Sequence, residues 1–203
     1  MSINLQKGQR IDLTKGNAGL DRILIGLGWD PAEQPKKSGL FGGLFGGGSA
    51  AADVDCDASV ILLQEDRLKQ DKDVVYFANL KALNGAVVHT GDNLTGEGDG
   101  DDEQILVQLK AIPESYNRLV FVVNIYQATK RNQDFGMIKN AFIRIVDQST
   151  NQELIRYNLS ENYAGNRTLI TGELYRHGSE WKFAALGNAT QDDSIGQVVK
   201  QYL

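Results

Sequence analysis

Short apolar runs recur along the whole chain, rich in Val, Ile, Phe and Tyr and separated by Gly, Asn or Asp. Val, Ile, Phe and Tyr favour extended strands, whereas Gly, Asn and Asp favour turns. The predicted strands cover residues 3–5, 10–13, 22–27, 54–63, 74–80, 86–89, 105–112, 119–126, 141–146, 153–158, 168–175 and 181–185. So many short strands at this spacing predict an all-β fold, a β-sandwich made of two sheets.

A few short accessory helices complete the predicted fold. The C-terminal segment DSIGQVVKQYL places four apolar side chains on one helical face, and Asp192 or Asp193 is the predicted N-cap. The four side chains belong to Ile195, Val198, Val199 and Tyr202. Shorter helical turns are expected within residues 112–118 and 132–140. We expect the C-terminal helix to pack on the sandwich, because its apolar face needs a partner surface.

A chain of 203 residues suits one domain, so residues 1–203 are predicted to form a single sandwich. One segment differs, at about residues 36–52, because six of the ten residues 39–48 are glycine. Glycine loses the most backbone entropy when it becomes ordered, so this segment is predicted to be a flexible insertion between strands. Its two Leu-Phe pairs leave a second interpretation open, in which they contact a partner.

The 26 acidic and 21 basic residues give a formal charge of −5, which argues against nucleic-acid binding. The single cysteine, Cys56, excludes an intrachain disulfide and fits a reducing compartment. The N-terminal residues lack the pattern of a secretory signal, and no apolar run reaches the roughly 20 residues of a membrane span. The sequence therefore predicts a cytoplasmic protein without an integral membrane segment.

The acidity is concentrated in one loop, HTGDNLTGEGDGDDE, at residues 89–103. Six of the twelve residues from Asp92 to Glu103 are acidic, and no Lys or Arg occurs between Lys81 and Lys110. Removing these six from the 26 acidic residues leaves 20, against 21 basic ones, so the rest of the chain is nearly balanced. Carboxylates this close repel one another. The loop therefore needs either water and salt or a bound metal ion to neutralise it.

The ligand types in this loop favour calcium. They are carboxylates, the Asn93 amide, the Thr90 and Thr95 hydroxyls, and backbone carbonyls that four interleaved glycines allow to turn inward. Calcium takes about six to eight such oxygens in a tolerant geometry, whereas magnesium keeps more water and zinc prefers His and Cys. The spacing is not that of an EF-hand. A solvated acidic turn is the alternative, and the density of acids without a neighbouring base favours metal binding over it.

A second candidate segment is DVDCDAS, at residues 53–59, which alternates acidic and apolar side chains. In an extended strand, Asp55 and Asp57 share one face, while Cys56 and its apolar neighbours face the core. The solvent-facing side of an edge strand explains this segment equally well. Asp30, which closes GLGWDP, is a third oxygen donor at a strand end. Strand ends on one side of a sandwich cluster, so the three segments are candidates to converge in space.

Six segments can be compared with known families. They are GLGWD at 26–30, DCDASVILL at 55–63, GDNLTGEGDGDDE at 91–103, KNAFIRIVD at 139–147, ELIRYNLSE at 153–161 and GELYRHGSEWKFAALG at 172–187. In content and order they resemble the TerD family, the tellurium-resistance and general stress proteins of bacteria. The resemblance covers nearly the whole chain.

This resemblance implies a β-sandwich with a few accessory helices, in agreement with the strand pattern. It also implies calcium binding through acidic loops at one end of the sandwich, and we expect two or more ions. By position, the implied calcium ligands are Asp30, Asp55, Asp57, Asp92, Asn93, Glu97, Asp101, Asp102 and Glu103. The glycine-rich segment is longer than expected between these motifs.

The family is linked to survival of tellurite and other stresses without a settled biochemical activity. The leading hypothesis is therefore a calcium-binding module of a stress response that binds protein partners and is not an enzyme. A metal-dependent hydrolase acting on a phosphate or another small anion is the alternative, although the sequence has no obvious base and no Arg and Lys cluster for such a substrate. Calcium-dependent peripheral association with an acidic membrane is also left open.

Overall fold

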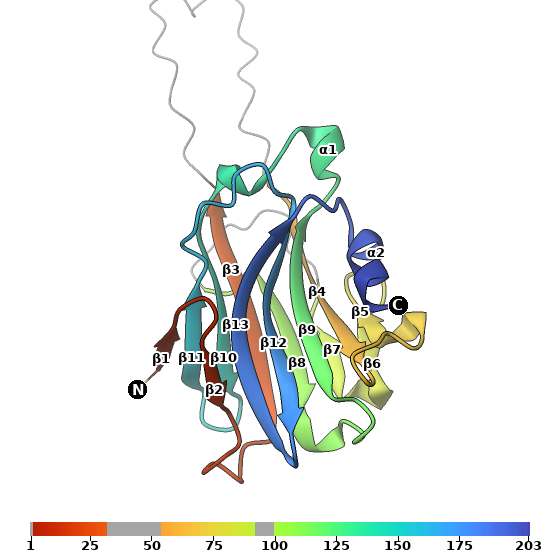
Figure 1. Ribbon diagram of the computed structural model, residues 1–203. Helices are drawn as coiled ribbons and strands as arrows, with labels where there is room; N and C mark the ends of the chain where they lie inside the picture. The colour runs from red at the N-terminus through yellow and green to blue at the C-terminus, as the bar shows by residue number, and fades with distance from the viewer. Residues whose placement is uncertain (1, 32–53, 92–99) are drawn as a thin grey trace, which may run out of the picture.

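The computed structural model describes residues 2–31, 54–91 and 100–203. These residues form two β-sheets packed face to face, which confirms the predicted β-sandwich (Figure 1). The glycine-rich insertion predicted at about residues 36–52 lies outside the described residues.

Neighbouring strands pair antiparallel in both sheets, with one exception in sheet A. Sheet A has the spatial order β1 (Ile3–Leu5), β11 (Gln152–Asn158), β10 (Ile138–Asp147), β3 (Arg22–Pro31), β8 (Glu103–Gln108), β7 (Val87–His89) and β6 (Lys81–Ala82). Sheet B has the order β2 (Arg10–Asp12), β13 (Glu180–Thr190), β12 (Thr168–His177), β9 (Arg118–Ile125), β4 (Cys56–Leu63) and β5 (Val74–Val75). The exception is β1, which pairs parallel to β11.

The helical elements are short. They are α1 (Ala128–Arg131), α2 (Ile195–Val198) and the 3₁₀ turns η1 (Asp71–Asp73), η2 (Leu83–Gly85), η3 (Leu109–Ala111), η4 (Phe135–Met137) and η5 (Val199–Tyr202). The turn expected within residues 132–140 is confirmed by η4. The helical turn expected within residues 112–118 is wrong, because this segment contains only a turn, in which Tyr116 N donates to Pro113 O at 3.0 Å.

The N-cap predicted for the C-terminal helix is also wrong. The residue at this position is Ser194. Asp193 is engaged elsewhere, because its carboxylate pairs with Arg167 Nε at 2.8 Å and accepts a hydrogen bond from Thr129 Oγ1. Asp192 Oδ2 likewise accepts a hydrogen bond from a neighbouring threonine. Both carboxylates therefore fix the start of the tail to the sandwich rather than capping the helix.

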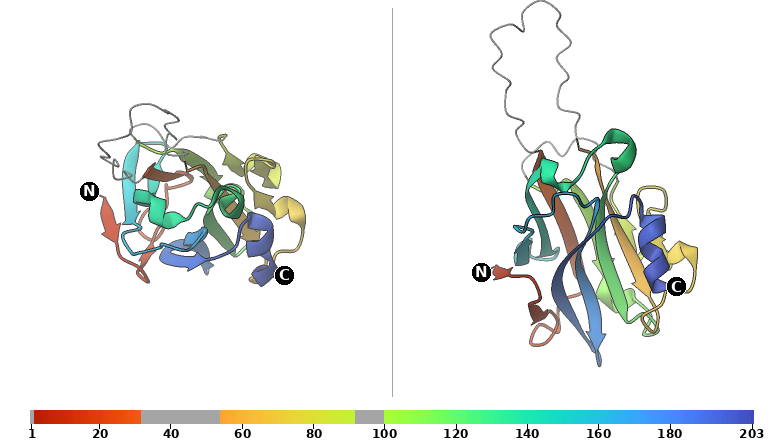
Figure 2. Two further views of the ribbon diagram at one scale, coloured as in Figure 1. Left: turned by 90° about the horizontal axis from the view of Figure 1, so that it is seen from above. Right: turned by 45° about the horizontal axis from the view of Figure 1, so that its top comes forward.

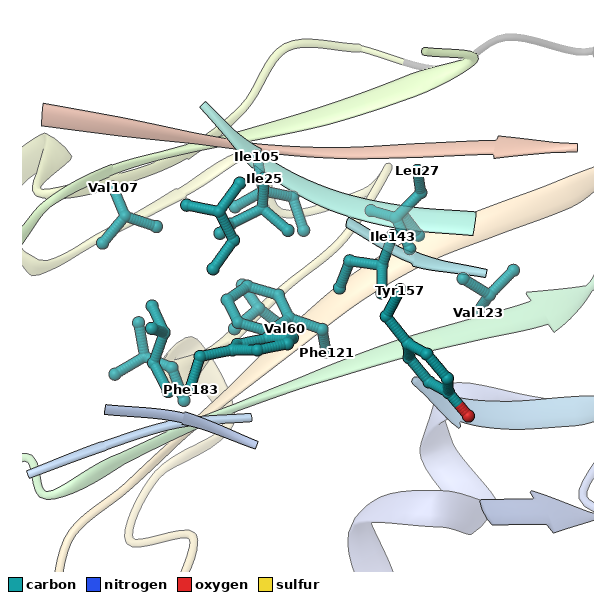
Figure 3. Packing of buried hydrophobic residues seen from close by; sticks show 14 of the residues in the cluster. Ile25, Leu27, Val60, Ile105, Val107, Phe121, Val123, Ile143, Tyr157 and Phe183 are labelled. Atoms are coloured by element: carbon teal, nitrogen blue, oxygen red, sulfur yellow. The ribbon is translucent and has the colours of Figure 1, made fainter. Parts of the chain in front are cut away.

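Side chains from the inner faces of both sheets form one large core (Figure 3). Phe121 and Phe183 of sheet B lie in one cluster with Ile25 and Ile143 of sheet A. Cys56 is fully buried in the same cluster, as its alternation predicts, and burial raises the pKa of its thiol. The inner residues of β4 therefore face the core, which confirms the predicted orientation of this strand.

A second, smaller cluster lies on the outer face of sheet B. It contains Ile61, Leu63, Leu68, Val74, Val120, Val122, Ile170 and Val198. Since Val198 belongs to α2, this cluster confirms that the C-terminal helix packs on the sandwich (Figure 2). Every residue of β4 is buried. Its pairing with β5 involves only Val60 and Ile61, so within the described parts of the chain residues 56–59 pair with β9 alone. The alternative interpretation of residues 53–59 is therefore right about a strand edge, but its solvent-facing side is wrong, because Asp55, Asp57 and Ser59 are buried.

Gly187 occupies a tight position in β13. It lies in a bulge of the β12–β13 pairing, has φ of 60°, and a Cβ there would overlap the Tyr157 hydroxyl. We expect Gly187→Ala to lower the free energy of unfolding by about 2–4 kcal/mol, from backbone strain and overpacking together. Gly178→Ala is the matched control, because Gly178 has φ of 65° but no atom within 4 Å of the position that a methyl group would take. The measurement is urea denaturation. Equal losses in the free energy of unfolding for the two variants would show that overlap with Tyr157 contributes nothing.

Candidate functional site

The three acidic segments come together at one end of the sandwich, where β3 ends and β4 and β8 begin (Figure 1). Two hydrogen bonds join the segments directly. Asp102 Oδ2 accepts from the backbone N of Trp29 in β3 at 2.7 Å, and Glu103 Oε2 accepts from the backbone N of Ala58 in β4. The expected convergence of these segments is therefore confirmed for their described residues.

Asp101 lies on the outer face of sheet A, over Gly26 of β3. A Cβ on Gly26 would overlap the Asp101 carboxylate, so glycine is what gives this carboxylate room. Arg144 of β10 binds it through two nitrogens, with Nε 2.7 Å from Oδ1 and Nη2 3.0 Å from Oδ2. The Asp101 side chain is 0% exposed. The expectation that no base neutralises the acidic loop is therefore wrong for Asp101, because a distant strand supplies Arg144.

Asp102 lies in a more negative environment. Burial raises the pKa of its carboxyl, the hydrogen bond from Trp29 lowers it, and the nearby charges of Asp30 and Asp101 raise it further. The net pKa is raised above the ordinary value of an aspartate. Asp30 is exposed, and its Oδ2 accepts a hydrogen bond from Asn140 Nδ2 at 2.7 Å. A cation at this point would favour the ionised form of Asp102.

The side chain of Glu103 is buried like that of Asp101, but it contacts a histidine and the opposite sheet. Its side chain and that of His89 are both 0% exposed, with Glu103 Oε2 3.3 Å from His89 Nε2. His89 Nδ1 accepts a hydrogen bond from the backbone N of Gly91, which leaves the imidazole proton on Nε2, facing Glu103. His89 and Glu103 both belong to sheet A, and the bond from Ala58 to Glu103 connects this pair to sheet B. Sequence patterns assigned no role to His89, and its burial could not be deduced from its position beside an acidic loop.

Asp55 and Asp57 lie on the side of β4 that faces away from the core, and both are buried. Asp55 Oδ2 is 3.1 Å from Arg131 Nη1, and Asp57 Oδ2 accepts a hydrogen bond from Asn124 Nδ2 at 3.4 Å. Asp101 lies on the outer face of sheet A, whereas these two lie toward the outer face of sheet B. Asp101 and the pair Asp55 and Asp57 therefore lie on opposite faces of the same end, whereas Glu103 lies between the sheets.

Three of the expected ligands, Asp92, Asn93 and Glu97, lie outside the described residues. Within residues 2–31, 54–91 and 100–203, no three His, Cys, Asp or Glu side chains are grouped so that they could hold a metal ion. The oxygens of Asp30 and Asp102 are nevertheless of the type that calcium binds. A complete calcium shell at this end requires further oxygens, from the rest of the acidic loop, backbone carbonyls or water.

A groove of about 760 Å³ lies next to this end of the sandwich. Asp30 and Gly100 form one side of it, and the basic residues Lys139 and Arg156 contribute to its lining. Arg156 stacks on Phe142, with its guanidinium carbon 4.1 Å from the ring centroid. The groove therefore places basic and aromatic groups beside the acidic segments.

A family model described as the TerD domain matches residues 1–202. The chain belongs to the TerD family. Among its relatives, stress response protein SCP2 of Bacillus subtilis is 54% identical over 203 residues, which cover all of both chains. Tellurium resistance protein TerD of Serratia marcescens is 39% identical over all of this chain and 97% of its own length. The resemblance found in the sequence motifs is thereby confirmed.

Solved structures support the same TerD fold. A crystal structure of a homologue of telluride resistance protein from Streptomyces coelicolor matches with a TM-score of 0.65 and 20% identity, covering 91% of this chain and 99% of that one. A crystallised protein of unknown function matches with a TM-score of 0.66 and 21% identity, covering 89% of this chain and 95% of its own. At these identities the likeness concerns the fold alone.

The names of the TerD relatives describe stress response and tellurium resistance, and they name no reaction. The described residues likewise add no observation that favours the hydrolase alternative. In the same described parts of the chain, no helix has the length and apolar character required to cross a bilayer.

Proposed function

We propose that this TerD-family protein is a cytoplasmic calcium-binding module of a bacterial stress response, which acts by binding partners and not as an enzyme. The observation that carries the proposal is the position of Asp102, which is partly buried and lies close to the like charge of Asp30 and to Asp101, the latter paired with Arg144. A carboxylate held next to other negative charge is best stabilised by a divalent cation. The names of the relatives support the link to stress and tellurium resistance.

The residues divide into proposed ligands and positioning residues. Asp30 and Asp102 are proposed to hold one ion together with the expected loop ligands, which are Asp92, Asn93 and Glu97. Asp101 and Glu103 already have strong protein partners in Arg144 and Ala58, so their main role is proposed to be fixing the end of the loop. Asp101 would then hold the end of the loop on the outer face of sheet A, and Glu103 would hold it on the inner face, before any ion binds.

Asp55 and Asp57 are proposed to serve a second ion, because they lie on the opposite face from Asp101. Bound calcium would reduce the repulsion between the acids next to the groove lined by Lys139 and Arg156. A partner protein is proposed to contact this calcium-bound surface. Partner binding is therefore proposed to require bound calcium.

The test is a calorimetric calcium titration of the wild type and three charge-removing variants. Asp102→Asn is expected to weaken one site by at least about tenfold, since losing even an outer-shell partner of a metal costs about 10–100-fold in affinity. Asp57→Asn is expected to weaken a different site, and Asp71→Asn, an exposed residue of η1, is the control that should titrate like the wild type. Identical titrations for all four proteins would contradict the assignment.

The same variants separate lost ligation from lost folding. In chelator, Asp102→Asn is expected to be at least as stable as the wild type, because burial disfavours the charged carboxylate that the variant removes. The amide oxygen can still accept the hydrogen bond from Trp29. A clearly less stable apo form, measured by urea denaturation, would show that the carboxylate serves the fold and not a metal.

A further inference from the structure

A second pocket, of about 540 Å³, opens on the outer face of sheet B. Its floor is formed by β4 and β9. Its other lining residues come from the turn after β5, from the segment that runs from the end of β9 into α1, and from the start of α2 with the two residues before it. The volume falls in the range of small-molecule sites, and the lining is mostly apolar.

Aromatic rings form one wall of this pocket. The Phe77 ring meets Tyr76 edge-on at 5.2 Å between centroids and meets Tyr126 edge-on at 6.1 Å. Phe77 is 41% exposed, which is unusual for a residue of this size. Aromatic faces attract cations, and Tyr126 already has the Arg131 guanidinium carbon 5.0 Å from its ring centroid. The wall is therefore suited to an organic cation as well as to an apolar body.

The floor of the pocket carries hydrogen-bonding groups. They are the carboxylate of Asp57, the amide of Asn124 and the hydroxyl of Ser59. Ser59 is 1% exposed, and its Oγ has no hydrogen-bond partner among the residues that the structure describes. A buried hydroxyl without a partner is costly, and a ligand that reaches the floor would supply one.

We propose that this pocket binds a small organic ammonium ion, whose charged end reaches the floor and whose apolar body lies against the aromatic wall. The buried end decides the sign of the charge, because the acceptors Asp57 and Ser59 lie there, whereas the basic residue Lys130 lies at the exposed rim. Desolvated polar groups discriminate between ligands far more strongly than exposed ones do. The inference does not rest on the proposed calcium function, although calcium at Asp57 would compete with the ligand.

The test uses benzylammonium as the probe and follows the backbone amide signals of Ser59 and Asn124 by NMR. The full chain is titrated in chelator, so that the outcome is independent of calcium binding. Benzyl alcohol and benzoate have the same ring with a neutral and a negative end, and serve as matched probes. The expected result is saturable binding of benzylammonium, with both matched probes at least about tenfold weaker, because the charged hydrogen bond to Asp57 is lost.

Variants locate the binding. Phe77→Ala is expected to weaken benzylammonium binding by about threefold through the lost ring contact, and Ser59→Ala by about threefold through the lost hydrogen bond. Leu80→Ala is the control, because Leu80 is 45% exposed and does not line the pocket. The proposal is overturned if benzyl alcohol or benzoate binds as tightly as benzylammonium. It is also overturned if both pocket variants bind the probe like the Leu80 variant.

Discussion

Glu103→Ala is expected to lower the free energy of unfolding by about 3–5 kcal/mol, the largest loss for any single residue at the acidic end. The carboxylate accepts the hydrogen bond of the Ala58 backbone N and lies 3.3 Å from His89 Nε2, in a region where both acid and imidazole are 0% exposed. The variant would leave the buried Ala58 N–H without its acceptor, would remove the carboxylate that faces His89 Nε2, and would also create a cavity. These effects act on the contact that joins the two sheets.

Two further variants make this result specific. Glu103→Gln keeps the shape and one acceptor oxygen, so it is expected to lose less than half as much. Glu161→Ala removes an exposed acid that pairs with Lys7 at 2.8 Å, and it is expected to cost about 0–1 kcal/mol. The measurement is urea denaturation of all three in chelator. The proposed role of Glu103 is wrong if its alanine variant costs no more than that of Glu161.

Saturating calcium is expected to raise the stability of the folded protein by about 2.7 kcal/mol at a hundredfold excess over the dissociation constant. For a chain of this size, that corresponds to a rise of about 5–10 °C in the melting temperature. The physical reason is that the ion binds the acids only where the fold has brought them together. Magnesium is expected to give a smaller rise, since it holds its water more tightly and accepts fewer protein ligands.

The control for this melt is Asp102→Asn, which is expected to lose most of the calcium-dependent rise while keeping the melting temperature of the apo protein. Thermal unfolding in calcium, in magnesium and in chelator provides the three midpoints for each protein. If the wild type melts at one temperature in all three solutions, the ion does not bind the fold.

Local patterns in the sequence predicted the strands and the direction of their side chains. The alternation in DVDCDASVILL placed Cys56 and Ala58 in the core, because side chains of a strand alternate between its two faces. The same local reasoning overextended two strands. The strand predicted over 105–112 ends at Gln108, directly before η3, and the one predicted over 74–80 ends at Val75, where a turn follows.

The partners of the acidic residues could not be predicted, because they depend on strand register. Arg144 is 43 residues from Asp101 in the sequence and meets it only because Arg144 lies opposite Gly26 in the β3–β10 pairing. The one local sign of these contacts in the sequence was the pair Gly26 and Gly28 in GLGWD. A glycine inside a strand often marks a close approach of another segment, and a Cβ on Gly28 would lie 2.7 Å from the Gly100 carbonyl oxygen.

Anomalous diffraction tests most directly whether the acidic end of this sandwich binds calcium. Crystals grown in millimolar calcium and measured at a long X-ray wavelength would locate the ion by its own scattering. We predict an anomalous peak within bonding distance of the Asp102 carboxylate oxygens. A well-ordered acidic loop with no peak beside Asp102 would contradict calcium binding at this end.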